Sequence, residues 1–368
     1  MIIVNPSEIT EPFFEFVSMK DPHMNFGFAN RVRFDHQNDL TNKLNFTRQW
    51  CKERNIQNLV MTGDVTDTNE EKKWSFNQYV LNKLELLKFK EDGITIWSPA
   101  GNHDMFNGMV QTDNTVFGEF VREGVLKHLT RTPLIKTFRD PENRDRNIFV
   151  IGIDYSKHKE VVQQELKRLN DYQSFGILKI VVFHSHCTPA EIAVTDFTYE
   201  ELVKTYTNID MFICGHYHGG FPSYTFFRKY PDGSDTSQHV KIVNNWSFQR
   251  VIRDYYNEMN VHTPEFEHIK IAWSHSTNDF IMSTETIKIP CKKYEDAFKP
   301  KMVELIKLTK KEHFEFFDKI NFEEIPTGSD DIETINNLAR KEEFSPEVVA
   351  LAIHYLNNVE VEDIEYDN

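Results

Sequence analysis

The stretch FICGHYHGG, Phe212 to Gly220, places two histidines one residue apart directly after an apolar run. Alternate side chains of an extended strand point to opposite faces, so these two imidazoles diverge unless the chain turns. Gly215, Gly219 and Gly220 permit such a turn. Neutral imidazole is the commonest protein ligand for a transition metal. An isolated pair of this kind is more often part of a polar loop, so the rest of the chain has to decide between the two interpretations.

Short apolar runs rich in β-branched residues alternate with amphipathic segments over the first two thirds of the chain. We expect strands at Asn58–Thr62, Ile94–Ser98, Ile148–Ile153, Ile177–Phe183 and Ile209–Cys214. We expect helices at Thr41–Glu53, Glu70–Lys88, Thr115–His128, Lys157–Tyr172 and Tyr199–Tyr206. After His218 the pattern predicts antiparallel strands at Ser223–Arg228, His239–Asn244, Phe266–Trp273 and Asp279–Lys288. The alternation of strands and helices predicts a layered α/β core.

Oxygen and nitrogen ligands follow the ends of several of these strands. Asp21-Pro-His23 follows FEFVSMK, Asp64 follows NLVMTG, and Asn102-His103-Asp104 follows ITIWSPAG. Because sites in α/β sheets form outside the carboxyl ends of strands, we expect these groups to converge. The expected metal ligands are Asp21, His23, Asp64, Asn102, His184, His216 and His218. Mixed oxygen and imidazole donors suit Mn, Fe or Zn, and one shared carboxylate would create a two-metal clamp for phosphate esters.

These motifs, in this order, resemble the calcineurin-like metallophosphoesterases over roughly residues 14–250. The resemblance implies an α/β fold with central β-sheets flanked by helices, a smaller C-terminal cap and a helical tail. It implies one ion on Asp21, His23, Asp64 and His218, and a second on Asp64, Asn102, His184 and His216. His103 would protonate the leaving oxygen, with Asp104 or a neighbour orienting its ring, and water activated by the ions would attack. Asp67 would support the ligands. The implied cofactor is a pair of divalent ions, Mn before Fe, Zn or Mg.

The sequence also narrows the branch of the family. Thr68-Asn69 stand where a phosphoprotein phosphatase has Arg-Gly, Asp67 stands where a purple acid phosphatase has a tyrosine ligand, and His23 replaces the cysteine of the lariat-debranching type. Strands continuing through KIVNNWSFQRV resemble the SbcD-type DNA repair nucleases, whereas GDVTD looks as much like a nucleotide phosphodiesterase. We therefore expect a Mn-dependent DNA exonuclease or endonuclease, with a small-molecule or cyclic-nucleotide phosphodiesterase as the alternative. A non-catalytic scaffold is disfavoured because none of the seven ligands is missing.

The predicted organisation has three parts: a nuclease domain at residues 1–262, a cap-like α/β segment at 263–311, and an acidic helical segment at 312–368 that docks a partner. The last segment has 16 acidic and 3 basic residues, so it carries most of the net charge of −15. The nearly neutral remainder permits a local phosphate-binding surface. The chain has no GK[ST] phosphate loop, and the resemblance implies a separate SbcC-type coiled-coil ATPase, DNA, and a homodimer within a heterotetramer as partners.

The composition, with 39% hydrophobic and 27% charged residues, is that of an ordinary globular protein. No apolar run reaches the roughly 18 residues of a membrane span, and the N-terminus lacks a signal-peptide pattern. Four scattered cysteines without a CxxC pair suggest reduced thiols. We therefore expect a cytoplasmic protein without membrane attachment, in the host cytoplasm if it is phage-encoded.

Overall fold

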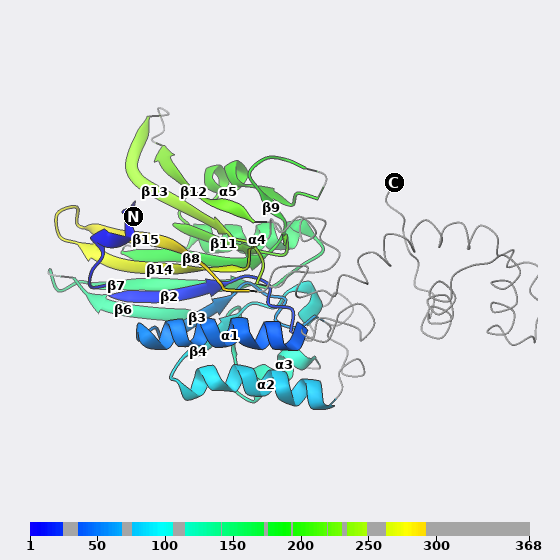
Figure 1. Cartoon of the computed structure of the whole chain (residues 1–368). Coiled ribbons are helices and arrows are strands. Elements are labelled where there is room, and N and C mark those ends of the chain that lie inside the picture. Colours follow the sequence, from blue (N-terminus) through cyan, green and yellow to red (C-terminus); the bar gives the residue numbers. More distant parts are fainter. Residues whose placement is uncertain are drawn as a thin grey trace, which may run out of the picture. The chain divides into compact units, whose positions relative to one another are not determined.

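The computed structural model describes residues 1–24, 36–67, 76–105, 115–140, 142–172, 176–192, 194–218, 220–229, 234–248 and 263–291. These residues form two β-sheets that pack face to face, with helices on their outer sides (Figure 1). The central strands of both sheets, such as Ile177–His184 and Met211–Gly215, bury side chains on both faces, which explains why the sequence shows continuous apolar runs there. The prediction of a layered α/β core with helices flanking the sheets is confirmed.

The first sheet has the strand order β1-β15-β14-β2-β3-β4-β5. Its strands are β1 (Ile2–Ile3), β2 (Phe14–Met19), β3 (Asn58–Met61), β4 (Thr95–Ser98), β5 (Lys127–His128), β14 (Glu265–Ser274) and β15 (Asp279–Lys288). Strands β2, β3, β4 and β5 run parallel, whereas β14 is antiparallel to both β2 and β15. The helices against its outer face are α1 (His36–Glu53), α2 (Phe76–Glu91) and α3 (Val116–Arg122).

The second sheet has the order β12-β13-β11-β8-β7-β6. Its strands are β6 (Leu134–Arg139), β7 (Asp145–Ile153), β8 (Ile177–His184), β11 (Met211–Gly215), β12 (Phe221–Lys229) and β13 (Asp235–Asn244). Helices α4 (Lys159–Asp171) and α5 (Tyr199–Thr205) cover its outer face. A short parallel pair, β9 (Cys187–Thr188) with β10 (Phe197–Thr198), lies between β8 and α5 in the chain. Strands β7, β8, β11 and β13 run parallel.

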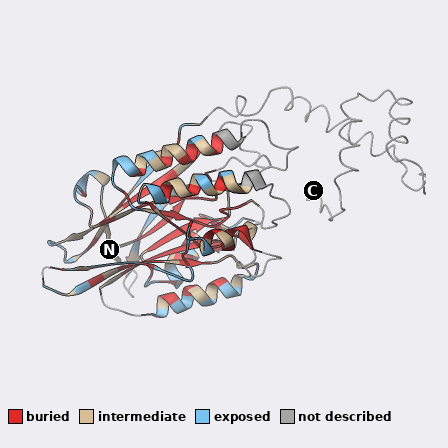
Figure 2. Cartoon of the chain, turned by 90° about the horizontal axis from the view of Figure 1, so that it is seen from below, coloured by how far each residue is buried: buried red, intermediate tan, exposed pale blue. Residues whose placement is uncertain are grey.

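Three apolar clusters hold these layers together, and Figure 2 shows the buried residues concentrated in the strands and on one side of each helix. The middle cluster joins the two sheets, for example through Phe16 of β2 and Val182 of β8, both fully buried. Val17 and Val181, one position away in each strand, pack instead against the helices. This period of two decides which layer each side chain enters, whereas the parallel direction of the strands brings the polar residues that follow them to one edge.

Most predicted elements are present, with small shifts at their ends. The expectation of one helix at Thr115–His128 is wrong in its second half: α3 ends at Arg122, and Lys127–His128 form β5. Gly124 has a φ of +68°, a left-handed conformation that ends the helix. The antiparallel pairing predicted after His218 is confirmed for β12 with β13 and for β14 with β15.

The domain boundary expected after residue 262 does not divide the fold. Strands β14 and β15 extend the first sheet beside β2, and one compact unit spans Met1–Ala297. The remainder of the expected cap, from residue 292, and the acidic segment 312–368 lie outside the described residues. Within the described part of the chain, no helix is long and apolar enough to cross a membrane.

Candidate metal centre

The polar residues that follow the strands meet at one edge of the two packed sheets. Strands β2, β3 and β4 of the first sheet lead into Asp21, His23, Asp64 and Asn102. Strands β8 and β11 of the second sheet lead into His184, His216 and His218. Asp64 lies within ion-pair distance of residues from both sheets. The structure therefore brings together the two groups that the sequence places more than 80 residues apart.

The backbone at this edge is unusual. Seven non-glycine residues of the described chain have a positive φ, and four of them are Asp21, His23, Asp64 and His216. Left-handed backbone costs about 1–2 kcal/mol for a residue with a Cβ, so it persists only where the surroundings enforce it. At His23, for example, the N–H donates to the Asp64 carbonyl at 2.9 Å. Strain concentrated in this way is typical of a functional site.

Asp64 is the centre of the cluster. Its Oδ2 lies 3.1 Å from His184 Nε2 and 3.6 Å from His23 Nε2. Two sets of possible metal donors share this carboxylate, one with His23 and His218 and one with His184 and His216, each with ligand atoms within 4.8 Å of one another. The two histidines of FICGHYHGG thus belong to different sets. A single carboxylate between two imidazole pairs is the arrangement that a bridged pair of ions requires.

Asp21 and Asn102 lie beside these sets. The amide oxygen of Asn102 is 3.0 Å from His184 Nε2. Asp21 is fully buried, accepts hydrogen bonds from the Thr62 hydroxyl and the His216 N–H, both at 2.9 Å, and lies 3.6 Å from His184 Nδ1. All seven expected ligands therefore lie in one cluster.

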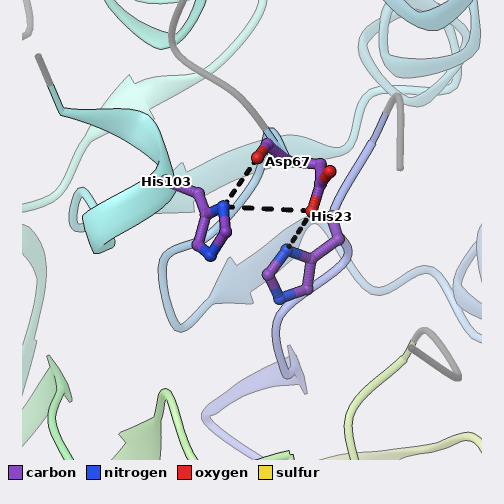
Figure 3. Close-up of side chains that lie close together, drawn as sticks. All are labelled: His23, Asp67 and His103. Carbon is purple, nitrogen blue, oxygen red and sulfur yellow. Dashed lines mark hydrogen bonds and ion pairs between the residues drawn. The ribbon is translucent and has the colours of Figure 1, made fainter. Parts of the chain in front are cut away.

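His103 lies at the outer side of the cluster, and its ring is oriented by Asp67 (Figure 3). Its Nδ1 is 2.6 Å from the Asp67 carbonyl oxygen and 3.9 Å from the Asp67 carboxylate. The same carboxylate lies 3.3 Å from His23 Nδ1, so Asp67 contacts both rings. The His103 side chain is 40% exposed, whereas those of His23 and His184 are almost wholly buried. Of His23, His103 and His184, His103 is therefore the most exposed to solvent.

Asp104 does not orient the His103 ring, although the sequence suggested this role for it or a neighbour. Its carboxylate accepts hydrogen bonds from the N–H groups of Gly101, Val65 and Thr66 and from the Thr66 hydroxyl, at 2.9–3.1 Å. None of these bonds goes to the His103 ring. Burial and the charge of Asp64 raise the pKa of Asp104 to about 6, against these hydrogen bonds. Asp104 therefore clamps the GNHD turn onto the loop that carries Asp64.

The charges within the cluster oppose one another. Burial lowers the pKa of His23, but the contact with Asp67 and the charges of the carboxylates outweigh it and raise that pKa to about 9. For His184, burial is likewise outweighed, chiefly by Asp64, and the pKa rises to about 9. Burial and neighbouring imidazoles lower the pKa values of His216 and His218. The metal-free cluster thus holds protons on two imidazoles and keeps the other two neutral.

The donors fit divalent cations. Asp64 Oδ2 is buried, and the His184 and His23 imidazoles lie 3.1 and 3.6 Å from it. In the metal-free cluster the charge of these two imidazoles balances the buried carboxylate, and divalent cations bound among the same groups would take the place of their protons. Imidazole, carboxylate and amide donors together suit Mn, Fe or Zn better than Ca or Mg. The residues present are therefore compatible with two transition-metal ions sharing Asp64.

Lys20, a cation directly before Asp21, points away from this cluster. Its Nζ donates to Asn244 Oδ1 of β13 at 2.5 Å, and burial lowers its pKa. The segment after β13 is held against the site by the Phe248 N–H, which donates to the Lys20 carbonyl at 2.7 Å, and by the Ser247 N–H, which donates to the His218 carbonyl at 3.3 Å. Lys20 therefore anchors the NNWSF segment, and from that position its charge helps to lower the pKa of His218.

His186 is a residue of this site that the sequence interpretation missed. The ring centroid of His186 lies 3.8 Å from that of His216. The backbone N–H of His186 donates to the Asp196 carboxylate at 2.8 Å. Tyr155, after β7, also contacts His216, with a centroid distance of 5.3 Å. The signal for His186 was available: His184-Ser-His186 repeats the spacing of His216-Tyr-His218.

A family model described as calcineurin-like phosphoesterase matches residues 21–220, which include all of the candidate ligands. A search of curated proteins finds no match. Among solved structures, a putative 5'-nucleotidase from Staphylococcus aureus is similar at 12% identity and a TM-score of 0.43, over 76% of this chain and 55% of that one. A dimetal phosphatase from Danio rerio is similar at 12% identity and a TM-score of 0.41, over 76% of this chain and 100% of that one.

Proposed function

The chain belongs to the calcineurin-like phosphoesterase family and is a metal-dependent phosphoester hydrolase of that superfamily, and from this premise we propose that it is a two-metal DNA nuclease. In this proposal Asp21, His23, Asp64 and His218 hold one ion, and Asp64, Asn102, His184 and His216 hold the other, with Mn as the metal. Two divalent cations supply Lewis acidity at the phosphate and lower the pKa of a water molecule.

The observation that carries the hydrolytic part of the proposal is the placement of His103. Its ring is fixed through Nδ1 by Asp67, which leaves Nε2 as the nitrogen on the opposite side of the ring. The side chain is partly exposed beside the donor sets, so Nε2 can reach a substrate oxygen. A positioned imidazole of this kind donates a proton to the leaving oxygen of a phosphodiester. Asp104 contributes by holding the turn that carries His103.

The choice of DNA rests on the sequence beyond the metal motifs. The strands after GHYH and the NNWSFQRV segment resemble the SbcD-type nucleases, and the structure ties NNWSF to Lys20 and His218. Residues 292–311 contain seven lysines and three acidic residues, a composition suited to phosphate contacts. The sequence has no GK[ST] loop, so ATPase activity would have to come from a partner; from the resemblance to the SbcD-type nucleases we propose an SbcC-type ATPase docked by the acidic segment 312–368, in an assembly that contains a homodimer. A cytoplasmic location is part of the same proposal.

A small phosphodiester, such as a cyclic nucleotide, is the second candidate because GDVTD resembles nucleotide phosphodiesterases as much as nucleases. Val65 and Thr66 in this motif are both fully buried, so their small size affects packing and does not open a substrate pocket directly. Both candidates are therefore compared directly in the following assay.

The test offers linear double-stranded DNA, single-stranded DNA and cyclic nucleotides to the purified full chain with Mn²⁺. We expect cleavage of DNA that is lost in His103→Ala and retained in His275→Ala, a matched change in the exposed β14–β15 turn. Intact DNA with a cleaved cyclic nucleotide would favour the second candidate. If Mn²⁺-loaded protein cleaves none of these esters, the proposal that it is a phosphodiesterase is refuted. Co-purification with an ATPase encoded by a neighbouring gene tests the partner.

A further inference from the structure

Three of the candidate ligand imidazoles can be compared by what holds their rings. His184 Nδ1 lies 2.9 Å from the Thr62 carbonyl oxygen, and His23 Nδ1 lies 3.3 Å from the Asp67 carboxylate. Such contacts fix the tautomer and the direction of the nitrogen that faces the metal. For the His216 ring, no described residue supplies a hydrogen bond. Its orientation must have another source.

Rings surround His216 instead. His184 and Tyr155 approach it at centroid distances of 4.7 and 5.3 Å, inclined at 46° and 58°. His186 is closer, at 3.8 Å, and nearer to parallel, at 34°. Face contact between tilted rings at such a distance restricts rotation about the side-chain torsions of both rings. His186 is therefore the residue best placed to set the plane of His216.

His186 is itself fixed from the other side. Its N–H donates to the Asp196 carboxylate at 2.8 Å, and its carbonyl accepts from the N–H groups of Asp196 and Phe197 at 2.9 and 3.1 Å. Its Nδ1 lies 3.8 Å from the same carboxylate. The backbone of His216 is fixed as well, because its N–H donates to Asp21 at 2.9 Å. Two rings on two fixed backbones leave little freedom to either side chain.

We propose that His186 is a positioning residue for the metal site that contains His184 and His216. The ring of His186 holds the His216 imidazole by contact with its face, and Asp196 in turn holds His186. This inference rests on the metal centre of the proposed function but not on DNA as the substrate. It assigns the ring face of His186, and not one of its nitrogens, as the group that matters.

The experiment titrates metal-free protein with Mn²⁺ and follows free and spin-coupled Mn²⁺ by electron paramagnetic resonance, with circular dichroism to check folding. His186→Ala should weaken one of the two Mn²⁺ sites by about 10–100-fold, the usual effect of losing a group that orients a ligand, and should leave the other unchanged. His186→Phe keeps an aromatic face without nitrogens and should restore affinity to within about 3-fold. His275→Ala, in the exposed turn, is the matched control and should bind both ions normally.

Unchanged Mn²⁺ affinities in His186→Ala would overturn the inference, and so would a His186→Phe variant as weak as the alanine variant. If His186→Ala does not fold, the comparison of His186→Phe with His186→Gln decides, because glutamine lacks a ring; equal affinities would then refute the role. Wild-type protein that binds no Mn²⁺ would refute the proposed function as well. Two normal sites in the wild type with no effect at His186 would refute only this inference.

Discussion

Gly101→Ala is the change that tests the geometry of the metal centre most directly. Gly101 lies at the start of the GNHD turn, against the loop that carries Asp64. A Cβ built there would lie 2.1 Å from Asp64 Oδ1 and 2.3 Å from the Asp64 backbone nitrogen, whereas ordinary contacts begin at 3.4 Å. The turn and the loop would therefore have to separate by roughly 1 Å, as the shortfall in these contacts requires.

The expected loss of stability follows from that separation. Overpacking of this size costs about 1–3 kcal/mol. The bonds from His103 N–H to Asp64 Oδ1 and from Thr66 N–H to Asp104 Oδ1, both 2.9 Å, cross from the turn to the loop and would lengthen beyond hydrogen-bond range. Each contributes about 1 kcal/mol net, so we expect the free energy of unfolding to fall by about 3–5 kcal/mol. Because Asp64 moves, both Mn²⁺ sites should weaken together.

Urea denaturation measures the stability, and Mn²⁺ titration measures the sites. Gly93→Ala is the matched control, because Gly93 has a φ of +78° and nothing within 4 Å of its Cβ position. It reports the cost of left-handed backbone alone, about 1–2 kcal/mol. Gly101 has a φ of −86°, so its own cost is steric. A Gly101→Ala variant no less stable than Gly93→Ala, with normal Mn²⁺ binding, would show that the reasoning is wrong.

Three further predictions concern proton transfer and charge. His103→Ala should reduce turnover by about 10²–10⁴-fold while bound Mn²⁺ stays unchanged; loss of metal would contradict the assigned role. Mn²⁺ binding at pH 7.5 should release protons, because the pKa values of His23 and His184 are raised to about 9 in the metal-free protein, and calorimetry in buffers of different ionisation enthalpy measures the release; no buffer dependence would contradict it. For Asp140, burial is outweighed by hydrogen bonds from Arg144 and Arg146, which lower the pKa to about 2. Since this folded-state pKa lies below the unfolded value, its stabilisation is present above about pH 4 and is lost as pH falls toward 2. Urea denaturation of Asp140→Asn should therefore show a smaller loss over that interval than the wild type, and equal losses would refute it.

The fold and the cluster were largely predictable because each ligand directly follows an apolar strand. A continuous buried strand fixes both its own position and the edge at which its last residue emerges, so Asp64 and His184 could be expected together before any pairing was known. The position of β14 was not predictable in this way. Its hairpin pattern is local, but its partner β2 lies about 250 residues earlier, and nothing in the pattern distinguishes an added edge from a separate cap.

The role of Asp104 depended on loop geometry that the sequence does not carry, and for His186 the sequence carries only the spacing His184-Ser-His186 and not the direction of the side chain. Asp104 is adjacent to His103, which suggested that it orients that ring. The 3-10 turn at Asn102–Asp104 instead directs its carboxylate toward Val65 and Thr66. The contact of His186 with Asp196 is set by the pairing of β9 with β10, which the spacing of the histidines does not reveal. In both cases the side chain's direction is set by a turn, where hydrophobic periodicity gives no information.

The seam between the two sheets has a consequence for the chemistry. Four of the candidate ligands follow strands of one sheet and three follow strands of the other, so each donor set combines side chains from both sheets, and the distances within it depend on the thickness of the apolar layer between the sheets. Side chains such as Phe16 and Val182 act as spacers in that layer. Because protein interiors are close-packed and transmit strain, a change of side-chain volume in this layer would shift the candidate ligands even though the changed residue does not contact them. The packing between the two sheets thus helps to set the distances between the candidate metal ligands.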